Sequence, residues 1–212
     1  MRDTSPVWRH PILLSLVAGY VAWGAWDWFE NRPLDPPDGV LAPTDPAQDD
    51  IPDGERANGE TPRIAGWTLS ARAHYHITAR VLGIERYRID PLAKLVPEDL
   101  ALGWGPMSDS GTLRSFEISQ SNRFYYWRPK GAMMLPRETV IAHSANTHVI
   151  PADPVVARRL SHLRPGQVVT LSGDLVDGVR DDGASIKTSL VRTDTGPGAC
   201  EVMLVREVEI ER

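Results

Sequence analysis

The chain has 212 residues, of which 28 are acidic and 23 are basic, giving a net charge of −5 and only one cysteine. Residues 1–62 carry four arginines and eleven carboxylates, whereas the remainder carries 19 basic and 17 acidic side chains. A nearly neutral C-terminal part lacks the basic surface that nucleic-acid binding requires, so this class of protein is excluded. A single cysteine also excludes a disulfide bond within the chain.

Residues 11–29 form an apolar run that is interrupted only by a late acid, Asp27. A helix of this length covers about 28 Å, which is close to the hydrocarbon thickness of a bilayer. Trp8 precedes the run and Trp28 lies at its far end, as expected for indole rings at two membrane interfaces. The sequence therefore predicts a transmembrane helix over residues 11–29, preceded by a cytoplasmic stub over residues 1–10.

The residues that flank this run predict its orientation. Arg2 and Arg9 precede it, whereas acids dominate the residues that follow. The positive-inside rule then places the N-terminus in the cytoplasm and the C-terminal part in the periplasm or outside the cell. This predicts a single-pass protein of the inner (cytoplasmic) membrane. The alternative is a cleaved signal peptide, but the tripeptide at residues 22–24 is a poor cleavage site.

One face of the predicted span carries small side chains, which allow another helix to approach closely in lipid. These residues are Ser15, Ala18, Ala22 and Ala25. The pattern predicts a partner helix, so we expect other membrane-protein subunits as partners.

The next segment, residues 30–62, is rich in Pro, Asp and Gly and contains no aromatic residue. Such a composition buries too little apolar surface to order itself. The sequence therefore predicts a flexible linker that tethers a folded domain over residues 63–212.

The domain at residues 63–212 has the patterns of a β-rich fold. Apolar residues alternate with polar ones from Tyr75 to Val81, and strand patterns recur over 167–176, 185–193 and 200–210. The last three segments are separated by turn residues and read as an antiparallel meander. We therefore expect a mainly β domain, an OB-like or Greek-key antiparallel barrel with one or two short helices.

Two helices are predicted between the strands. The acids after Pro97 predict a short helix that ends at Gly103, and Asp153 followed by Pro154 predicts a capped helix start. The apolar face of the second helix is Val155, Val156, Leu160 and Leu163.

Candidate binding residues lie in loops and in one aromatic strand. Aromatic rings beside arginine suit stacking on a sugar, a peptide or a base, although the same rings also suit a barrel core. The predicted contact surface comprises Trp104, Asp109, Asn122, Arg123, Tyr125, Trp127, His143, Asn146 and His148.

Cys200 suggests an alternative to a binding function, because Cys, His and Asn side chains together can form the catalytic site of a thiol hydrolase. A neighbouring imidazole lowers the pKa of a thiol, and an amide can orient that imidazole. His148 and Asn146 are the candidates, with His143 as a second imidazole. No spacing of His with Asp or Glu matches a strong metal motif, so we expect neither a metal nor a cofactor.

The domain contains four distinctive sequence motifs, at residues 100–109 (LALGWGPMSD), 118–127 (ISQSNRFYYW), 143–151 (HSANTHVIP) and 194–201 (DTGPGACE). Together with NRPLDPPDGVLAP at residues 31–43, they resemble an uncharacterised bacterial family of single-pass, envelope-facing membrane proteins. The resemblance implies a shared domain with these loops as its shared surface, and it implies no activity.

The sequence thus favours a membrane-anchored extracytoplasmic binding or assembly module, an accessory subunit of a membrane complex rather than an enzyme. A thiol hydrolase of the envelope is the alternative. The sequence does not specify a small-molecule ligand.

Overall fold

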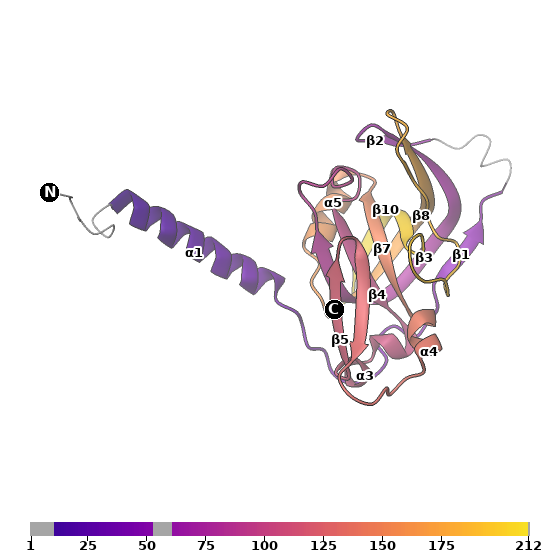
Figure 1. Ribbon diagram of the computed structural model, residues 1–212, viewed down its shortest axis with the longest axis horizontal. Helices are drawn as coiled ribbons and strands as arrows, with labels where there is room; N and C mark the ends of the chain where they lie inside the picture. The colour runs from indigo at the N-terminus through magenta and orange to yellow at the C-terminus, as the bar shows by residue number, and fades with distance from the viewer. Residues whose placement is uncertain (1–10, 53–60, 212) are drawn as a thin grey trace. The chain divides into compact units, whose positions relative to one another are not determined.

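The computed structural model describes residues 11–52 and 61–211, and it divides into two compact units, one ending at Pro33 and one beginning at Leu34 (Figure 1). The first unit contains helix α1 (Pro11–Asn31), whose side chains from Ile12 to Ala25 are exposed, the small-residue face included. In the ranges just given, no helix is both long and apolar enough to cross a membrane. The predicted cytoplasmic stub falls outside the described residues.

The second unit is mainly β, as predicted, and its main sheet closes on itself. Five strands pair in a ring, in the order β3 (Trp67–Arg86), β4 (Glu98–Gly103), β7 (Ser144–Pro151), β10 (Glu201–Ile210) and β8 (Val168–Arg180). Strand β8 pairs back onto β3, which completes the ring. All these pairs are antiparallel except β7 with β10, which is parallel. The expectation of a wholly antiparallel barrel is therefore wrong, and the sheet is mixed.

Shorter strands extend the ring. Strands β1 (Ala47–Asp50) and β2 (Arg63–Ile64) pair with β3, and β9 (Ser185–Ile186) pairs with β8. The predicted meander is also corrected, because β9 has only two residues and β10 pairs with β7 and β8 instead. A separate hairpin is formed by β5 (Phe116–Ser121) and β6 (Phe124–Pro129).

Alternation along β3 builds the core, as the sequence predicts. Tyr75, Ile77, Ala79 and Val81 are buried in one cluster with leucines and valines of the other ring strands. A second buried cluster lies around Trp67 and includes Leu95, Leu204, Ile150 and Val202. Because successive strand residues point to opposite faces, the ring is packed on its inside and partly covered on its outside.

Helix α5 (Pro154–Ser161) confirms the predicted second helix. The Asp153 side chain accepts hydrogen bonds from the backbone N–H groups of Val155 and Val156 at 2.7 and 2.9 Å. Val156, Leu160 and Leu163 join the main core, whereas Val155 is 62% exposed, so the predicted apolar face is correct except at Val155.

The predicted helix ending at Gly103 is wrong, because these residues form β4, and all six residues of β4 are buried. The acids after Pro97 pair with side chains of the sheet instead of stabilising a helix N-terminus. The remaining helical segments are short and lie between β4 and β7: a 3-10 turn η2 (Gly105–Ser108), α3 (Ser110–Leu113) and α4 (Arg137–Ala142).

Residues 34–51 of the predicted linker belong to the second unit and pack against its barrel. The backbone N–H of Leu34 donates to the carbonyl of Pro165 at 2.7 Å, and the N–H of Ala42 donates to Ser108 Oγ at 3.0 Å. Ala42 is fully buried, and the Trp104 indole N–H donates to Asp45 at 3.1 Å. Backbone hydrogen bonds and β1 pairing hold the segment, so its apolar content alone does not reveal the docking.

Removing residues 1–50 should therefore destabilise the second unit. Trp104 would lose its cover and its indole partner, which should lower the free energy of unfolding by on the order of 3 kcal/mol or more. Urea unfolding followed by tryptophan fluorescence measures this loss. The matched control is the chain that begins at Leu34, which keeps these contacts. Equal unfolding midpoints for the two shortened chains would contradict the docked arrangement.

Candidate functional site

A polar cluster lies on the outer face of β4 and β7, around the Asp99 carboxylate. Asp99 is completely buried and is the register partner of His148 across the two strands. His148 Nδ1 lies 2.7 Å from Asp99 Oδ1, and the Tyr87 hydroxyl lies 2.9 Å from Asp99 Oδ2. The Arg123 guanidinium adds an ion pair at 3.4 Å. The carboxylate is thus surrounded by donors from three separate segments.

The β5–β6 hairpin is fixed over this cluster by its turn. Asn122 and Arg123 both have positive φ, 53° and 65°, as in the two-residue turns that favour hairpins. The Arg123 side chain reaches Asp90 at 2.8 Å and lies 3.8 Å from the centre of the Tyr87 ring. These contacts stabilise a conformation that residues with a Cβ rarely adopt.

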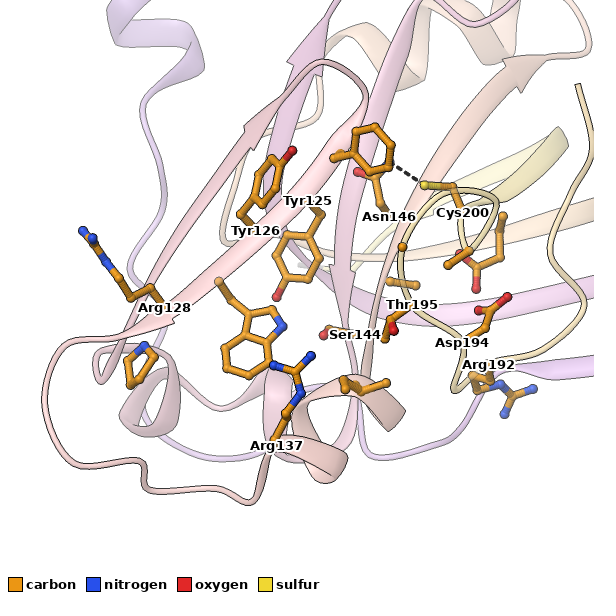
Figure 2. A pocket seen from close by; sticks show the side chains of 18 of the residues that line it. Tyr125, Tyr126, Arg128, Arg137, Ser144, Asn146, Arg192, Asp194, Thr195 and Cys200 are labelled. Carbon is orange, nitrogen blue, oxygen red and sulfur yellow. Dashed lines mark hydrogen bonds between the residues drawn. The ribbon is translucent and has the colours of Figure 1, made fainter.

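Cys200 lies at the edge of the cluster, immediately before β10. Its thiol interacts with the His148 imidazole, and its Sγ accepts a hydrogen bond from Asn146 Nδ2 at 3.6 Å, the dashed line in Figure 2. The thiol also faces the carbonyl oxygen of Arg123 at 3.9 Å. The backbone N–H of Ser189 donates to the Cys200 carbonyl at 3.0 Å, which holds the preceding loop back against β10.

Opposing effects set the protonation of His148. Burial favours the neutral imidazole and lowers its pKa. The hydrogen bonds to Asp99 and Cys200 and the electrostatic interaction with both groups outweigh burial, so that the pKa of His148 rises to about 9. An imidazolium is therefore the favoured form of His148 beside the thiol at neutral pH.

An open pocket of about 480 Å³ begins at Cys200 and extends along β6 (Figure 2). Aromatic side chains of β6 line one side, and the loop before β10 lines the other. Polar and charged groups on the wall include Arg137, Ser144, Asn146, Arg192 and Asp194. Figure 2 shows Arg192, Asp194 and Cys200 on one side, with Tyr125 opposite them and Asn146 between.

Glu201 is a buried acid on the wall of this pocket. It is 5% exposed, and its Oε2 atom has no hydrogen-bond partner among residues 11–52 and 61–211. Burial is the main cause that raises the pKa of Glu201 to about 7. Thr147, its register partner on β7, also has a hydroxyl without a hydrogen-bond partner in the described part of the chain. Buried polar atoms without partners indicate that a water or a ligand completes the site.

The structure brings part of the predicted contact surface together at the pocket. Tyr125, Trp127 and Asn146 line it, and Arg123 and His148 lie behind its wall. Asn122 is exposed at the hairpin turn.

Three predicted contact residues instead have structural roles away from the pocket. Trp104 is fully buried, so its predicted place in the contact surface is corrected. Asp109 caps α3 and accepts from the N–H of Gly39 at 2.9 Å, which helps to hold the docked segment. The His143 imidazole donates to the carbonyl of Thr139 at 2.7 Å, within its own helix end.

Sequence reasoning missed Asp99 as a member of this site and did not place Glu201 among the contact residues. Asp99 follows Pro97, a pattern typical of a helix start, and Glu201 stands beside the more conspicuous Cys200. A period-two reading of β4 would have placed Asp99 on the face opposite Leu100, toward the face of His148. Over the described ranges, no group of three or more His, Cys, Asp or Glu side chains is arranged to hold a metal ion.

Comparison with the models of known protein families, with curated proteins and with solved structures finds no match to this chain. Function is therefore inferred from the geometry of the site.

Replacing His148 with glutamine should change how stability depends on pH. Because the pKa of His148 is raised from 6.5 to about 9 on folding, its charged form stabilises the folded state. That contribution is fully present below about pH 6.5 and is lost as the pH rises through about 9. The stability difference between wild type and His148→Gln should shrink by about 3 kcal/mol between about pH 6 and pH 10.

Urea unfolding at a series of pH values measures this difference, and subtraction of the two curves removes the contributions of titrating groups that do not interact with His148. A difference that stays constant with pH would contradict the charged His148 inferred here.

Proposed function

We propose that this chain is a membrane-anchored extracytoplasmic binding module, an accessory subunit that holds a segment of a partner protein. The observation that carries this proposal is the open pocket between β6 and the loop before β10, which Glu201 lines, and the Glu201 Oε2 atom has no hydrogen-bond partner in the described part of the chain. A surface whose buried polar groups lack protein partners is suited to receive them from another molecule.

The fold proposed for this module is an OB-like barrel. The five-strand ring, its one parallel pair between the third and last strands, and α5 between the third and fourth strands support this assignment. OB-folds bind their ligands on the face of the second and third strands, between loops that include the one joining the last two strands. The pocket lies at the start of β7, the third strand, beside the loop that joins β8 to β10.

The lining of the pocket suits a polypeptide. Aromatic rings of β6 offer apolar contact area, with Arg137 over the Trp127 ring, and Arg192 and Asp194 lie on the opposite side of the pocket. Mixed charges beside aromatic rings match the side chains and amide groups of a peptide segment. A subunit of the same membrane complex fits the small-residue face of α1 as well as this pocket.

Helix α1 is the proposed anchor. Ile12, Leu16 and Tyr20 are 76, 67 and 72% exposed, and burial of such side chains in lipid would remove them from water. The arginines that precede α1 support an N-terminus in the cytoplasm and a periplasmic or external second unit. The resemblance to single-pass envelope proteins supports the same topology.

If α1 anchors the chain, the full-length protein should stay in the membrane pellet after alkaline carbonate washing. The chain that begins at Leu34 should be released under the same conditions. Immunoblotting of pellet and supernatant measures both. Release of the full-length chain with its N-terminal residues removed would contradict the anchor and would indicate a cleaved signal peptide.

If the pocket binds a partner protein, a photo-crosslinking amino acid at Tyr126 should give a discrete adduct in native membranes. Tyr126 is 49% exposed and lies at the pocket rim, so the probe should not disturb the fold. The matched control carries the same probe at Arg158, an exposed residue of α5 that does not line the pocket.

The adduct should form only from the pocket rim, and it should weaken when Trp127→Ala is added to the Tyr126 probe. Identical adducts from both positions, or none from Tyr126, would contradict partner binding at this pocket.

A further inference from the structure

Cys200, His148 and Asp99 form a continuous series of interacting groups whose thiol end lies on the wall of the pocket. From this arrangement we propose that Cys200 is a nucleophilic thiol that accepts an acyl group from an ester or thioester bound in the pocket. His148 transfers the proton, and Asp99 is a positioning residue that holds the imidazole. This goes beyond a binding role and does not depend on the membrane anchor.

The position of each group fits its role. Asp99 is completely buried and contacts Nδ1 of His148, which leaves the other ring nitrogen for the thiol. His148 is 8% exposed, so the imidazole is shielded while the sulfur lies on the pocket wall. A structural thiol buried among apolar groups is inert, whereas a thiol beside an imidazole on the wall of an open pocket has the surroundings of a nucleophile.

A second observation points to a ligand in the same pocket. Glu201 also lines the pocket, from the face of β10 opposite to Cys200, and its buried Oε2 atom has no hydrogen-bond partner among the described residues. No group in residues 11–52 and 61–211 hydrogen-bonds that atom, so a bound molecule would find an unused polar group within the site.

The reaction proceeds in two balanced steps. In the first, the Cys200 thiolate attacks the acyl carbon, a sulfur–carbon bond forms, the bond to the leaving alcohol or thiol breaks, and imidazolium His148 gives its proton to the leaving group. In the second, water attacks the acyl carbon, His148 takes a proton from the water, the sulfur–carbon bond breaks, and the carboxylic acid leaves with the thiolate restored.

Asn146 is placed to assist at the oxyanion. Its Nδ2 group lies 3.6 Å from Cys200 Sγ and 3.2 Å from the carbonyl oxygen of Arg123, so its two hydrogens serve different acceptors. A side-chain amide this close to the nucleophilic sulfur can donate to the negative oxygen that develops during attack.

Several charged groups face this pair and bear on its pH dependence. Asp99 of β4 contacts His148 directly, and Glu201 of β10 interacts with it electrostatically. The other ionisable groups around the pair are Arg123 on the hairpin, Tyr87 and Asp90 on the loop after β3, and Arg192 and Asp194 on the loop before β10.

The first experiment measures the rate of Cys200 alkylation by iodoacetamide against pH, with the full chain in mild detergent. Wild type should react about tenfold faster than His148→Gln at about pH 6.5, because an ordinary thiol is mostly protonated there. The control variant His76→Gln, which removes a histidine paired with Ser172 on β8, should match wild type. Equal rates in wild type and His148→Gln would overturn the proposal.

The second experiment follows acetyl transfer from p-nitrophenyl acetate. Mass spectrometry should find one acetyl group on Cys200 and turnover beyond one equivalent, with both lost in Cys200→Ser and turnover reduced in His148→Gln. An acetyl group that accumulates without turnover, or acetylation that is as fast in His148→Gln, would overturn the hydrolytic role. Circular dichroism establishes that each variant is folded.

Partner binding is tested separately by placing the Tyr126 photo-crosslinking probe in the Cys200→Ser chain. Retained crosslinking with loss of acetyl turnover supports thiol chemistry at a working binding pocket. A wild-type thiol without raised reactivity overturns the thiol proposal and leaves the binding proposal to stand on its own crosslinking result.

Discussion

The Asp99 carboxylate is the group on which the arrangement of the site depends. A carboxylate without solvent exposure loses several kcal/mol of hydration, and the cost is offset only if donors surround it. Those donors are the His148 imidazole, the Tyr87 hydroxyl and the Arg123 guanidinium. They come from β7, from the loop after β3 and from the β5–β6 hairpin, so one buried charge holds three segments in a single arrangement.

Arg123 links this electrostatic constraint to the chemistry of the pocket. Its side chain is held by Asp90 and Asp99, while its backbone adopts a left-handed conformation that closes the hairpin. Its carbonyl oxygen is then near both Asn146 Nδ2 and the Cys200 thiol. The residue that fastens the hairpin therefore also helps to position the amide and the sulfur beside the pocket.

The sequence predicts those parts of the fold that follow from local patterns. Alternation from Tyr75 to Val81 identifies a half-buried strand, and Asp153 identifies the start of α5, because both signals lie within a few residues. The parallel pair of β7 with β10 and the docking of residues 34–51 depend on distant partners, and no local pattern contains them. The assignment of Asp99 to a helix start is wrong for the same reason. An acid after proline favours a helix N-terminus locally, but the partner of Asp99 is His148, 49 residues away in the sequence.

In the candidate site too, some residues can be identified from the sequence and others only from the folded structure. Cys200, His148 and Asn146 attract attention as residue types, and the structure brings all three together. Asp99 and Glu201 are common acids whose importance comes only from burial. Trp104 shows the reverse error, because a conspicuous aromatic residue at a Gly-rich turn lies inside the domain, covered by the docked segment.

The parallel pairing of β7 with β10 has a consequence for biosynthesis. Parallel neighbours cannot be joined by a tight turn, and here α5 and β8 are made between them. Asn146 and Cys200 are 54 residues apart, so the sulfur leaves the ribosome roughly 3 to 10 seconds after the amide. A nascent chain can thus assemble the hairpin and the buried carboxylate before any thiol is present.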